Sequence, residues 1–227
     1  AANTKTVVIF GKSWTFQVTD IIKTTLSENL AMIRDTCAYL CANGRNVIYD
    51  AEHFFTGYLN DSEYAMKTLE AAVEGGAKVL SLCETKGGCM IKDCEKIVSA
   101  VSKQFAGRAT VGIHTHNDSG LAVANSLVAV EAGARHVQGV FLGFGERTGN
   151  ANLSCIIPDL QLKMGYPCIA EEKMAELTPI AKRIAEIANI ALNPQLPYVG
   201  SCAFSHKAGM HIDKKKKNPS AYEHVSP

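Results

Sequence analysis

Short apolar runs recur along this chain roughly every 30 residues, and each is followed by a longer amphipathic stretch. The runs predict buried strands at 6–10, 46–49, 78–82, 109–113 and 136–140. The stretches between them predict helices at 27–43, 60–74, 91–105 and 119–131, with Ser27 and Asn60 as N-terminal caps of the first two. Strict alternation of strand and helix predicts a parallel sheet.

Polar side chains follow these strands directly, at Asp50 and Glu52, Glu84 and Thr85, His114 and His116, and Glu146 and Asn150. Reactive groups at strand ends are typical of a (β/α)₈ barrel or of an open doubly wound sheet. Groups from four successive strands favour the barrel, because an open sheet would gather them at one switch point. A complete barrel needs about 250 residues, so five strands predict a partial one that lacks about three N-terminal units.

The expected architecture is therefore an α/β fold in two parts. Residues 1–165 form the C-terminal part of a TIM-barrel catalytic domain, with about five βα units. Residues 166–227 begin a helical linker subdomain, and helices are predicted at 150–163 and 171–191.

Composition narrows the class of protein. The net charge of +1 gives no electrostatic reason to expect nucleic acid or an anionic membrane as partner. The 47% hydrophobic and 20% charged fractions are ordinary for a globular protein. No apolar stretch approaches the length of a membrane span, and the N-terminus lacks the layout of a signal peptide. The eight cysteines form no C-x-x-C pair, so we expect reduced thiols in a cytoplasmic protein.

His114 and His116 end one strand, and alternation places both imidazoles on one side of it. Two such imidazoles can bind a divalent metal, although structural hydrogen bonding is the alternative. The next strand leads into a loop with three glycines, in which Asn150 can add an oxygen ligand. This set suits Mn²⁺, Zn²⁺, Fe²⁺ or Mg²⁺. The loop is not a phosphate-binding loop, because Gly143–Gly149 do not follow G-x-G-x-x-G.

Two other features carry charge. Glu52 at a strand mouth is a candidate general acid or base, with a salt bridge as the alternative. The lysines at 214–217 are either a solvated surface or an attraction for an anionic substrate or cofactor phosphate.

Long motifs connect the chain to a known family. Gly112-Ile-His-Thr-His-Asn-Asp118 and Gly143-Phe-Gly-Glu-Arg-Thr-Gly-Asn-Ala-Asn-Leu153 resemble the metal-site signatures of the isopropylmalate, homocitrate and citramalate synthases. These belong with the metal-dependent aldol and Claisen barrels that include hydroxymethylglutaryl-CoA lyase. Further segments are similar to the citramalate synthase branch: Ile9–Trp14, Asp50–Phe55, Leu121–Ser126, Gln161–Gly165 and Ala203–His211.

The resemblance implies an acyltransferase that converts the acyl group into an alkyl group on transfer. Acetyl-CoA would condense with a 2-oxo acid, pyruvate preferred, to give citramalate in isoleucine biosynthesis. It implies His114, His116 and Asn150 at a divalent metal (Mn, Mg or Zn), Thr85 and Glu146 in substrate binding, and Glu52, His211 and Tyr222 as catalytic residues. It also implies a homodimer in which the tail reaches the partner's barrel.

Three departures from the family pattern qualify these expectations. The Arg-Asp-Gly motif that supplies an Arg and the metal's Asp is absent, as is the C-terminal regulatory domain, so we expect a truncated chain that is inactive alone. The usual Asp-Thr-Asn-Gly is Glu84-Thr-Lys-Gly87, which bears on oxo-acid choice. The alternatives are an isopropylmalate or homocitrate synthase, an aldolase-type lyase, and a non-catalytic metal-binding fragment.

Overall fold

A computed structural model describes residues 3–218 and 221–225 of the chain. Two compact units make it up, residues 1–151 and residues 152–227. This division follows from contacts within the backbone. It does not test the predicted end of the catalytic domain at residue 165, which stays a prediction.

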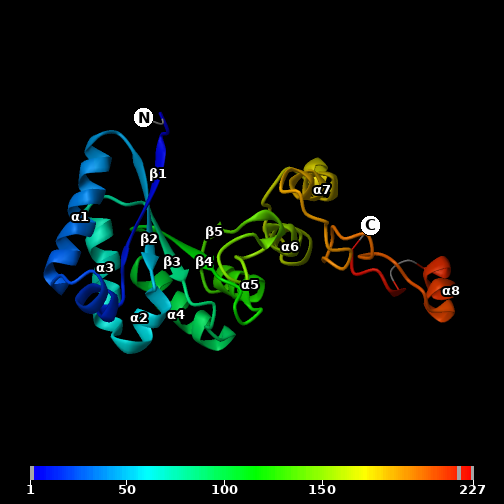
Figure 1. Ribbon diagram of the computed structural model, residues 1–227, viewed down its shortest axis with the longest axis horizontal. Coiled ribbons are helices and arrows are strands. Elements are labelled where there is room, and N and C mark those ends of the chain that lie inside the picture. The colour runs from blue at the N-terminus through cyan, green and yellow to red at the C-terminus, as the bar shows by residue number, and fades with distance from the viewer. Residues whose placement is uncertain (1–2, 219–220, 226–227) are drawn as a thin grey trace. The chain divides into compact units, whose positions relative to one another are not determined.

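The first unit is built on a sheet of five parallel strands in sequence order (Figure 1). They are β1 (Thr6–Lys12), β2 (Asn46–Glu52), β3 (Val79–Glu84), β4 (Thr110–Thr115) and β5 (His136–Gln138). Each strand pairs with the next one along the chain, and every pairing is parallel. The predicted strands, their order and the α/β class are thereby confirmed, with no switch point among the five.

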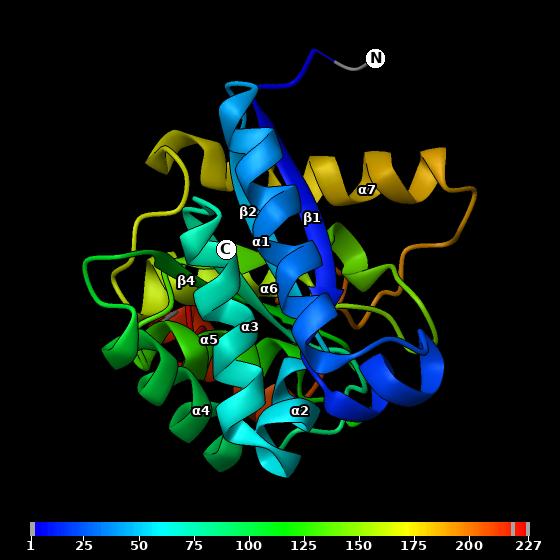
Figure 2. The ribbon, with the colours of Figure 1, turned by 90° about the vertical axis from the view of Figure 1, so that its left-hand side faces the viewer.

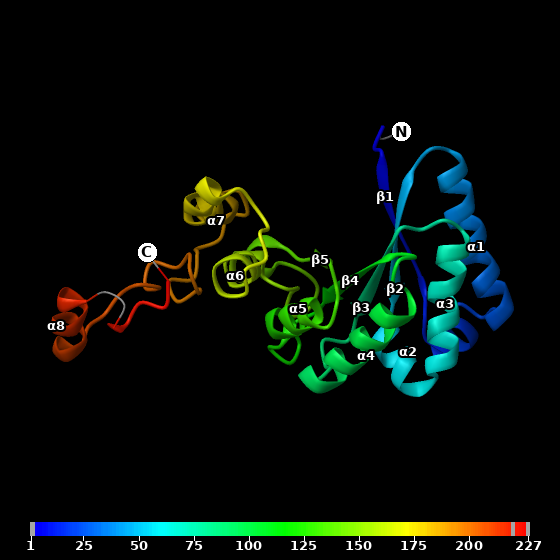
Figure 3. The same ribbon diagram turned by 180° about the vertical axis from the view of Figure 1, so that it is seen from behind.

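Four long helices lie against one face of this sheet. They are α1 (Leu26–Ala42), α3 (Ser62–Glu74), α4 (Ile91–Gln104) and α5 (Ala122–Glu131). Figure 2 looks onto the helices with the strands behind them, and Figure 3, which shows the view of Figure 1 from behind, has these helices and the strands side by side. The core fills the space between the layers, where Tyr49, Leu69, Leu80 and Phe105 are fully buried. Each of the leucine and phenylalanine side chains contributes about 1.5–3 kcal/mol of transfer free energy.

The two predicted N-terminal caps are wrong by one or two residues. Helix α1 is capped by Thr25, whose hydroxyl accepts the Glu28 N–H at 3.1 Å. Asn60 instead ends a short helix, α2 (Phe54–Asn60), that the sequence pattern did not indicate. Asp61 then caps α3 and accepts the Tyr64 N–H at 3.0 Å. A π-helical turn at Gln17–Ile21 was also not predicted.

Alternation along the strands decides which residues face away from the helices. In β2, Val47, Tyr49 and Ala51 are buried, so Asp50 and Glu52 point to the opposite face. On the edge strand β1 the opposite face is uncovered, and the Phe10 side chain is 71% exposed. This face, away from the helices, carries the candidate site.

The second unit is mainly helical. Its elements are α6 (Leu153–Pro158), a π-helical turn (Asp159–Lys163), a 3₁₀ segment (Glu171–Glu176), α7 (Leu177–Ile187) and α8 (Gly209–Lys217). The helix predicted for 171–191 is therefore shorter and begins as 3₁₀. It ends early because Asn189 takes a left-handed conformation, with φ of 53°. None of the described helices has the length and apolarity needed to cross a bilayer.

Candidate functional site

A pocket of about 260 Å³ opens at the carboxyl ends of strands β1 to β4. Residues of all four strand ends line it: Phe10, Asp50, Glu52, Cys83, Thr85, His114 and His116. Four of the eight predicted site residues therefore meet here. Convergence at this edge follows from the parallel topology, because the strands all end on the same side of the sheet.

The two histidines lie side by side, with ring centroids 5.3 Å apart. The Nδ1 atom of His114 is 2.9 Å from the side-chain oxygen of Gln138 on the neighbouring strand. His116 forms an isolated antiparallel bridge with Asn150, so the third predicted ligand comes next to the pair. The structure thus brings together the three residues predicted to bind metal.

Two buried polar atoms at this bridge have no hydrogen-bond partner: Nδ1 of His116 and Oδ1 of Asn150. Burial without a partner costs free energy, so such atoms call for a ligand. Burial also lowers the pKa of His116, which favours the neutral imidazole that metals bind. Two imidazoles and an amide oxygen fit a divalent cation. Among the described residues, no three His, Cys, Asp or Glu side chains form a metal-binding cluster.

Glycines hold the loop that presents Asn150. A Cβ at Gly145 would lie 2.5 Å from the Asn150 amide nitrogen, and one at Gly149 would lie 2.0 Å from the Gly143 carbonyl oxygen. Neither distance is compatible with a side chain. Glycine is therefore required at positions 145 and 149, because the loop backbone there lies too close to Asn150 and Gly143 for any side chain.

Thr85 is oriented by its neighbours on both sides. The His53 backbone N–H donates to its hydroxyl at 2.8 Å, and His53 takes a left-handed conformation with φ of 59°. Because the oxygen already accepts this bond, its own proton is free to point toward an acceptor in the pocket. Arg147 donates to the Thr85 carbonyl at 2.9 Å and to both oxygens of Asp118, at 2.7 and 2.8 Å.

Glu52 forms an ion pair with Lys12, which lies opposite it on β1. The salt-bridge alternative is thus present in the structure, but it orients a carboxylate that still lines the pocket. Glu146 is exposed on the glycine loop and does not line this pocket.

His211 and Tyr222 belong to the second unit. Their rings stack with centroids 4.4 Å apart and planes at 30°, and His206 lies beside both. His206 in turn contacts Glu223, at 3.2 Å from Nε2 to Oε1. His211 and Tyr222 therefore lie side by side, while the catalytic role predicted for them stays a prediction.

Sequence reasoning missed several residues of the pocket. Phe10 and Cys83 line it, and Lys12 pairs with Glu52. Gln138 contacts both His114 and Asp50, the latter at 2.8 Å. A signal existed for Gln138, which is a polar residue inside an apolar strand and faces the same side as His136.

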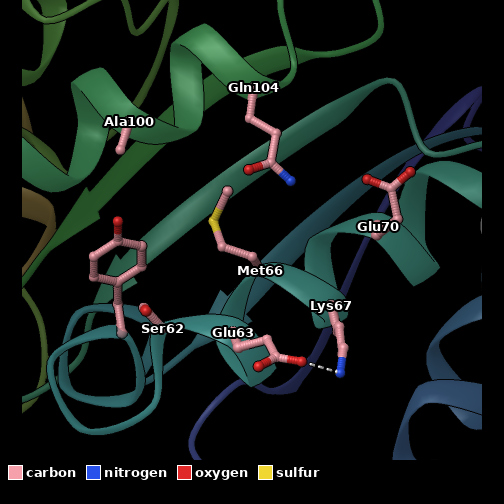
Figure 4. Close-up of a pocket in the computed structure, with 8 residues that line it drawn as sticks. Ser62, Glu63, Met66, Lys67, Glu70, Ala100 and Gln104 are labelled. Atoms are coloured by element: carbon pink, nitrogen blue, oxygen red, sulfur yellow. Dashed lines mark hydrogen bonds and ion pairs between the residues drawn. The ribbon is translucent and has the colours of Figure 1, made fainter.

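A larger hollow, of about 520 Å³, lies between α3 and α4 (Figure 4). Its carboxylates are already engaged, Glu63 with Lys67 at 2.6 Å and Glu70 with Arg108. The hollow holds no histidine or cysteine among its lining residues. It therefore lacks the chemistry of the smaller pocket.

Comparison with known proteins agrees with this geometry. Residues 1–185 match the HMGL-like family. The chain belongs to this family. Residues 198–227 match the homocitrate synthase post-HMGL domain-like family. The chain is 50% identical to the (R)-citramalate synthase of Synechocystis sp. and 53% identical to that of Aquifex aeolicus, each over 100% of its length.

The chain spans 43% of the length of each of these two curated relatives. Its fold resembles the crystal structure of an HMG-CoA lyase from Bacillus subtilis, with a TM-score of 0.71 and 22% identity. That match covers 83% of this chain and 65% of the lyase chain. The HMGL-like barrel therefore accounts for the five consecutive parallel strands.

Proposed function

We propose that this chain is part of a synthase that condenses acetyl-CoA with pyruvate to give citramalate. A carbon–carbon bond forms between the acetyl methyl carbon and the ketone carbon, and hydrolysis of the thioester releases coenzyme A. The observation that carries the proposal is the meeting of His114, His116, Thr85 and Glu52 at one pocket, with Asn150 beside them. The two relatives named (R)-citramalate synthase support this choice of reaction.

His114, His116 and Asn150 would hold a divalent cation, for which Mn²⁺, Mg²⁺ and Zn²⁺ are the candidates. The unpartnered Nδ1 of His116 and Oδ1 of Asn150 support this assignment. When bound, the cation supplies Lewis-acid polarisation of a carbonyl oxygen.

Thr85 supplies binding of the oxo-acid carboxylate. Its hydroxyl accepts the His53 N–H, which leaves the hydroxyl proton free to be donated to a carboxylate oxygen in the pocket. Arg147 fixes the Thr85 carbonyl and thereby the loop. Glu146 is exposed on the glycine loop and does not line the pocket. We propose that it contacts the part of the substrate that extends beyond the pocket.

Glu52 is the carboxylate beside the reacting carbons, held in place by Lys12. A carboxylate oriented in this way can accept a proton from the acetyl methyl group. We assign the remaining acid–base role to His211 with Tyr222, whose stacked rings support a joint function. The lysines near the end of α8 would attract the phosphates of coenzyme A.

The wider context is proposed on the resemblance. It includes a homodimer, a role in isoleucine biosynthesis and a cytoplasmic location. All eight cysteines are free, which supports a reducing compartment. Light scattering after size-exclusion chromatography tests the dimer, and a mass of one chain would contradict it.

The activity is tested on the natural protein in which this sequence occurs. Purified protein is freed of metal and incubated with acetyl-CoA and pyruvate, with and without added Mn²⁺, Mg²⁺ or Zn²⁺. We expect citramalate and free coenzyme A in equal amounts, only when metal is present. Reactions without pyruvate control for simple thioester hydrolysis. Thiol release without citramalate under every metal would overturn the proposal.

A further inference from the structure

Gln138 connects two strands that do not touch in the sheet. Its amide nitrogen donates to Asp50 Oδ1 at 2.8 Å, although β3 and β4 separate β2 from β5. The curved sheet brings these side chains together over its open face. By register, Asp50 lies in one row with Ser81, Gly112 and His136, and Gln138 lies two residues further along β5 than His136. Ser81 and Gly112 are small, so they leave room above the sheet for the Gln138 side chain to reach Asp50.

The other end of the same amide contacts His114. The Gln138 Oε1 atom lies 2.9 Å from His114 Nδ1. Asp50, Gln138 and His114 therefore form one continuous chain of hydrogen bonds, from the floor of the pocket to a predicted metal ligand.

The chemistry of the three groups fixes which atom donates and which accepts in each of the two hydrogen bonds. The Gln138 amide nitrogen is the atom that contacts Asp50, and it can only donate, so the Asp50 carboxyl oxygen accepts. Burial raises the pKa of Asp50, while the bond from Gln138 and the nearby His114 and His136 act in the opposite direction. The amide oxygen then faces His114 and can only accept. His114 must therefore donate from Nδ1, and Nε2 is left without a proton. Metal-binding histidines commonly donate their other ring N–H in this manner.

We propose that Asp50 and Gln138 are positioning residues that fix His114 in the Nδ1-protonated tautomer and leave Nε2 as its ligand-binding nitrogen. The inference rests on the proposed function for the identity of the ligand, a divalent cation. The tautomer of His114, in contrast, depends only on residues of this chain. It is set before any metal binds.

The tautomer is measured directly by ¹⁵N NMR of the 227-residue chain labelled on histidine, with no metal present. His114→Asn identifies the His114 signals by their loss. We expect the wild-type His114 to be protonated at Nδ1. Gln138→Met removes both hydrogen bonds at similar volume, and it should move His114 toward the Nε2-protonated form that a free imidazole prefers in water. Gln104→Met, on the exposed side of α4, is the matched control.

A double variant separates direction from simple packing. The double variant Asp50→Asn, Gln138→Glu rebuilds both hydrogen bonds but moves the carboxylate from position 50 to position 138. The new carboxylate at position 138 accepts from the imidazole and from the new amide at position 50. This variant should restore the Nδ1-protonated form, which a purely structural role for Gln138 does not predict. A wild-type His114 protonated at Nε2, or a Gln138→Met spectrum equal to wild type, would overturn the proposal.

Mn²⁺ titration followed by electron paramagnetic resonance supplies the second readout. Gln138→Met should weaken Mn²⁺ binding about 10- to 100-fold, with recovery in the double variant. Equal affinity of Gln138→Met and wild type contradicts the positioning role. If the natural protein binds no Mn²⁺ while the tautomer behaves as expected, the metal assignment in the proposed function fails and the positioning of His114 stands.

Discussion

His116 and Asn150 face each other across an antiparallel bridge at the end of a sheet that is otherwise parallel. Backbone hydrogen bonds flank the bridge, from Asn117 N–H to the Gly149 carbonyl at 2.9 Å and from Ala151 N–H to the Thr115 carbonyl at 3.1 Å. The spacing of the imidazole and the amide is therefore set by backbone. Changes in the glycine loop should act on the site without touching either donor.

Gly145→Ala tests this dependence. The new Cβ would fall 2.5 Å from the Asn150 amide nitrogen, so the amide must move. We expect Mn²⁺ affinity to fall at least about tenfold, as losses of supporting groups around metal sites commonly cost 10–100-fold. Gly120→Ala is the control, because Gly120 also has positive φ but a Cβ there meets nothing within 4 Å. Equal Mn²⁺ affinity in the two variants would show that the loop does not position Asn150.

His114→Ala tests the metal itself in the natural protein. Removing one of two imidazoles leaves a donor set too weak to hold a divalent cation in the catalytic position. We expect metal-dependent citramalate formation to be lost, with the folded state retained by circular dichroism. Wild-type protein treated with a chelator should show the same loss and recover on addition of Mn²⁺. Activity of His114→Ala that is unchanged without metal would refute the assignment.

The sequence predicted the sheet well because its signals are local. Each strand is a short apolar run followed by a polar residue, and parallel pairing then brings Thr85, His114 and His116 to one edge. The H-x-H spacing alone placed two imidazoles on one side of β4. Helix starts were less well predicted, since Thr25 and Asp61 compete with nearby Ser27 and Asn60 as caps.

What the sequence could not indicate is contact across the open face. Asp50 and Gln138 are 88 residues apart and lie on strands that are not neighbours. Their contact depends on the curvature of the sheet, which has no local pattern. Likewise, the pairing of Glu52 with Lys12 depends on strand register, and the register is set by the whole strand pair.

Buried thiols predict an alkaline limit to stability. Burial raises the pKa of Cys37 to about 11, with a smaller contribution from Cys41. A folded pKa above the unfolded value of about 8.5 means that the folded state holds its proton more tightly. The contribution is complete below about pH 8.5 and is lost as the pH rises toward 11, at up to about 1.4 kcal/mol per pH unit.

Urea unfolding at several pH values between 8 and 11 measures this loss. Cys37→Ala removes the titrating group, so its unfolding free energy should fall less steeply with pH even though its value at pH 8 is lower. The exposed Cys202 provides the control, because Cys202→Ala should leave the slope as in wild type. Parallel slopes for Cys37→Ala and wild type would contradict the prediction.

The 227-residue chain by itself should condense acetyl-CoA with pyruvate poorly or not at all. Two neutral imidazoles and one amide bring no negative charge to a divalent cation. Asp50 and Glu52 line the same pocket, but no three His, Cys, Asp or Glu side chains of the described residues are grouped so that they could hold a metal ion. Strand β1 also exposes its edge, with Val8 and Phe10 uncovered, which favours association. Coenzyme A release by this chain alone, compared with the natural protein under the same metal, is the measurement. Equal rates would show that the donors present here suffice.

Lys86 bears on the choice of 2-oxo acid in the proposed reaction, because the resemblance described above implies asparagine at this position. Its ammonium lies 4.4 Å from the centroid of the Trp14 ring, a cation–π contact worth about 0.5–1 kcal/mol at an exposed site. A lysine held over Trp14 is not aimed at a second substrate carboxylate. We therefore expect pyruvate to have the highest kcat/KM among pyruvate, 2-oxoisovalerate and 2-oxoglutarate in the natural protein.

Lys86→Asn then measures how much the cation contributes. Small changes in a binding site alter discrimination by about 1–3 kcal/mol, or about 5- to 150-fold. Because Lys86 does not line the pocket, we expect a rise in the pyruvate to 2-oxoglutarate ratio at the low end of this range and no change in the order of substrates. Trp14→Leu releases Lys86 from its ring contact without removing the charge, and it should raise kcat/KM for 2-oxoglutarate relative to Lys86→Asn. If wild-type protein already prefers 2-oxoglutarate, the lysine binds the second carboxylate despite Trp14, and the substrate assignment moves to the homocitrate branch.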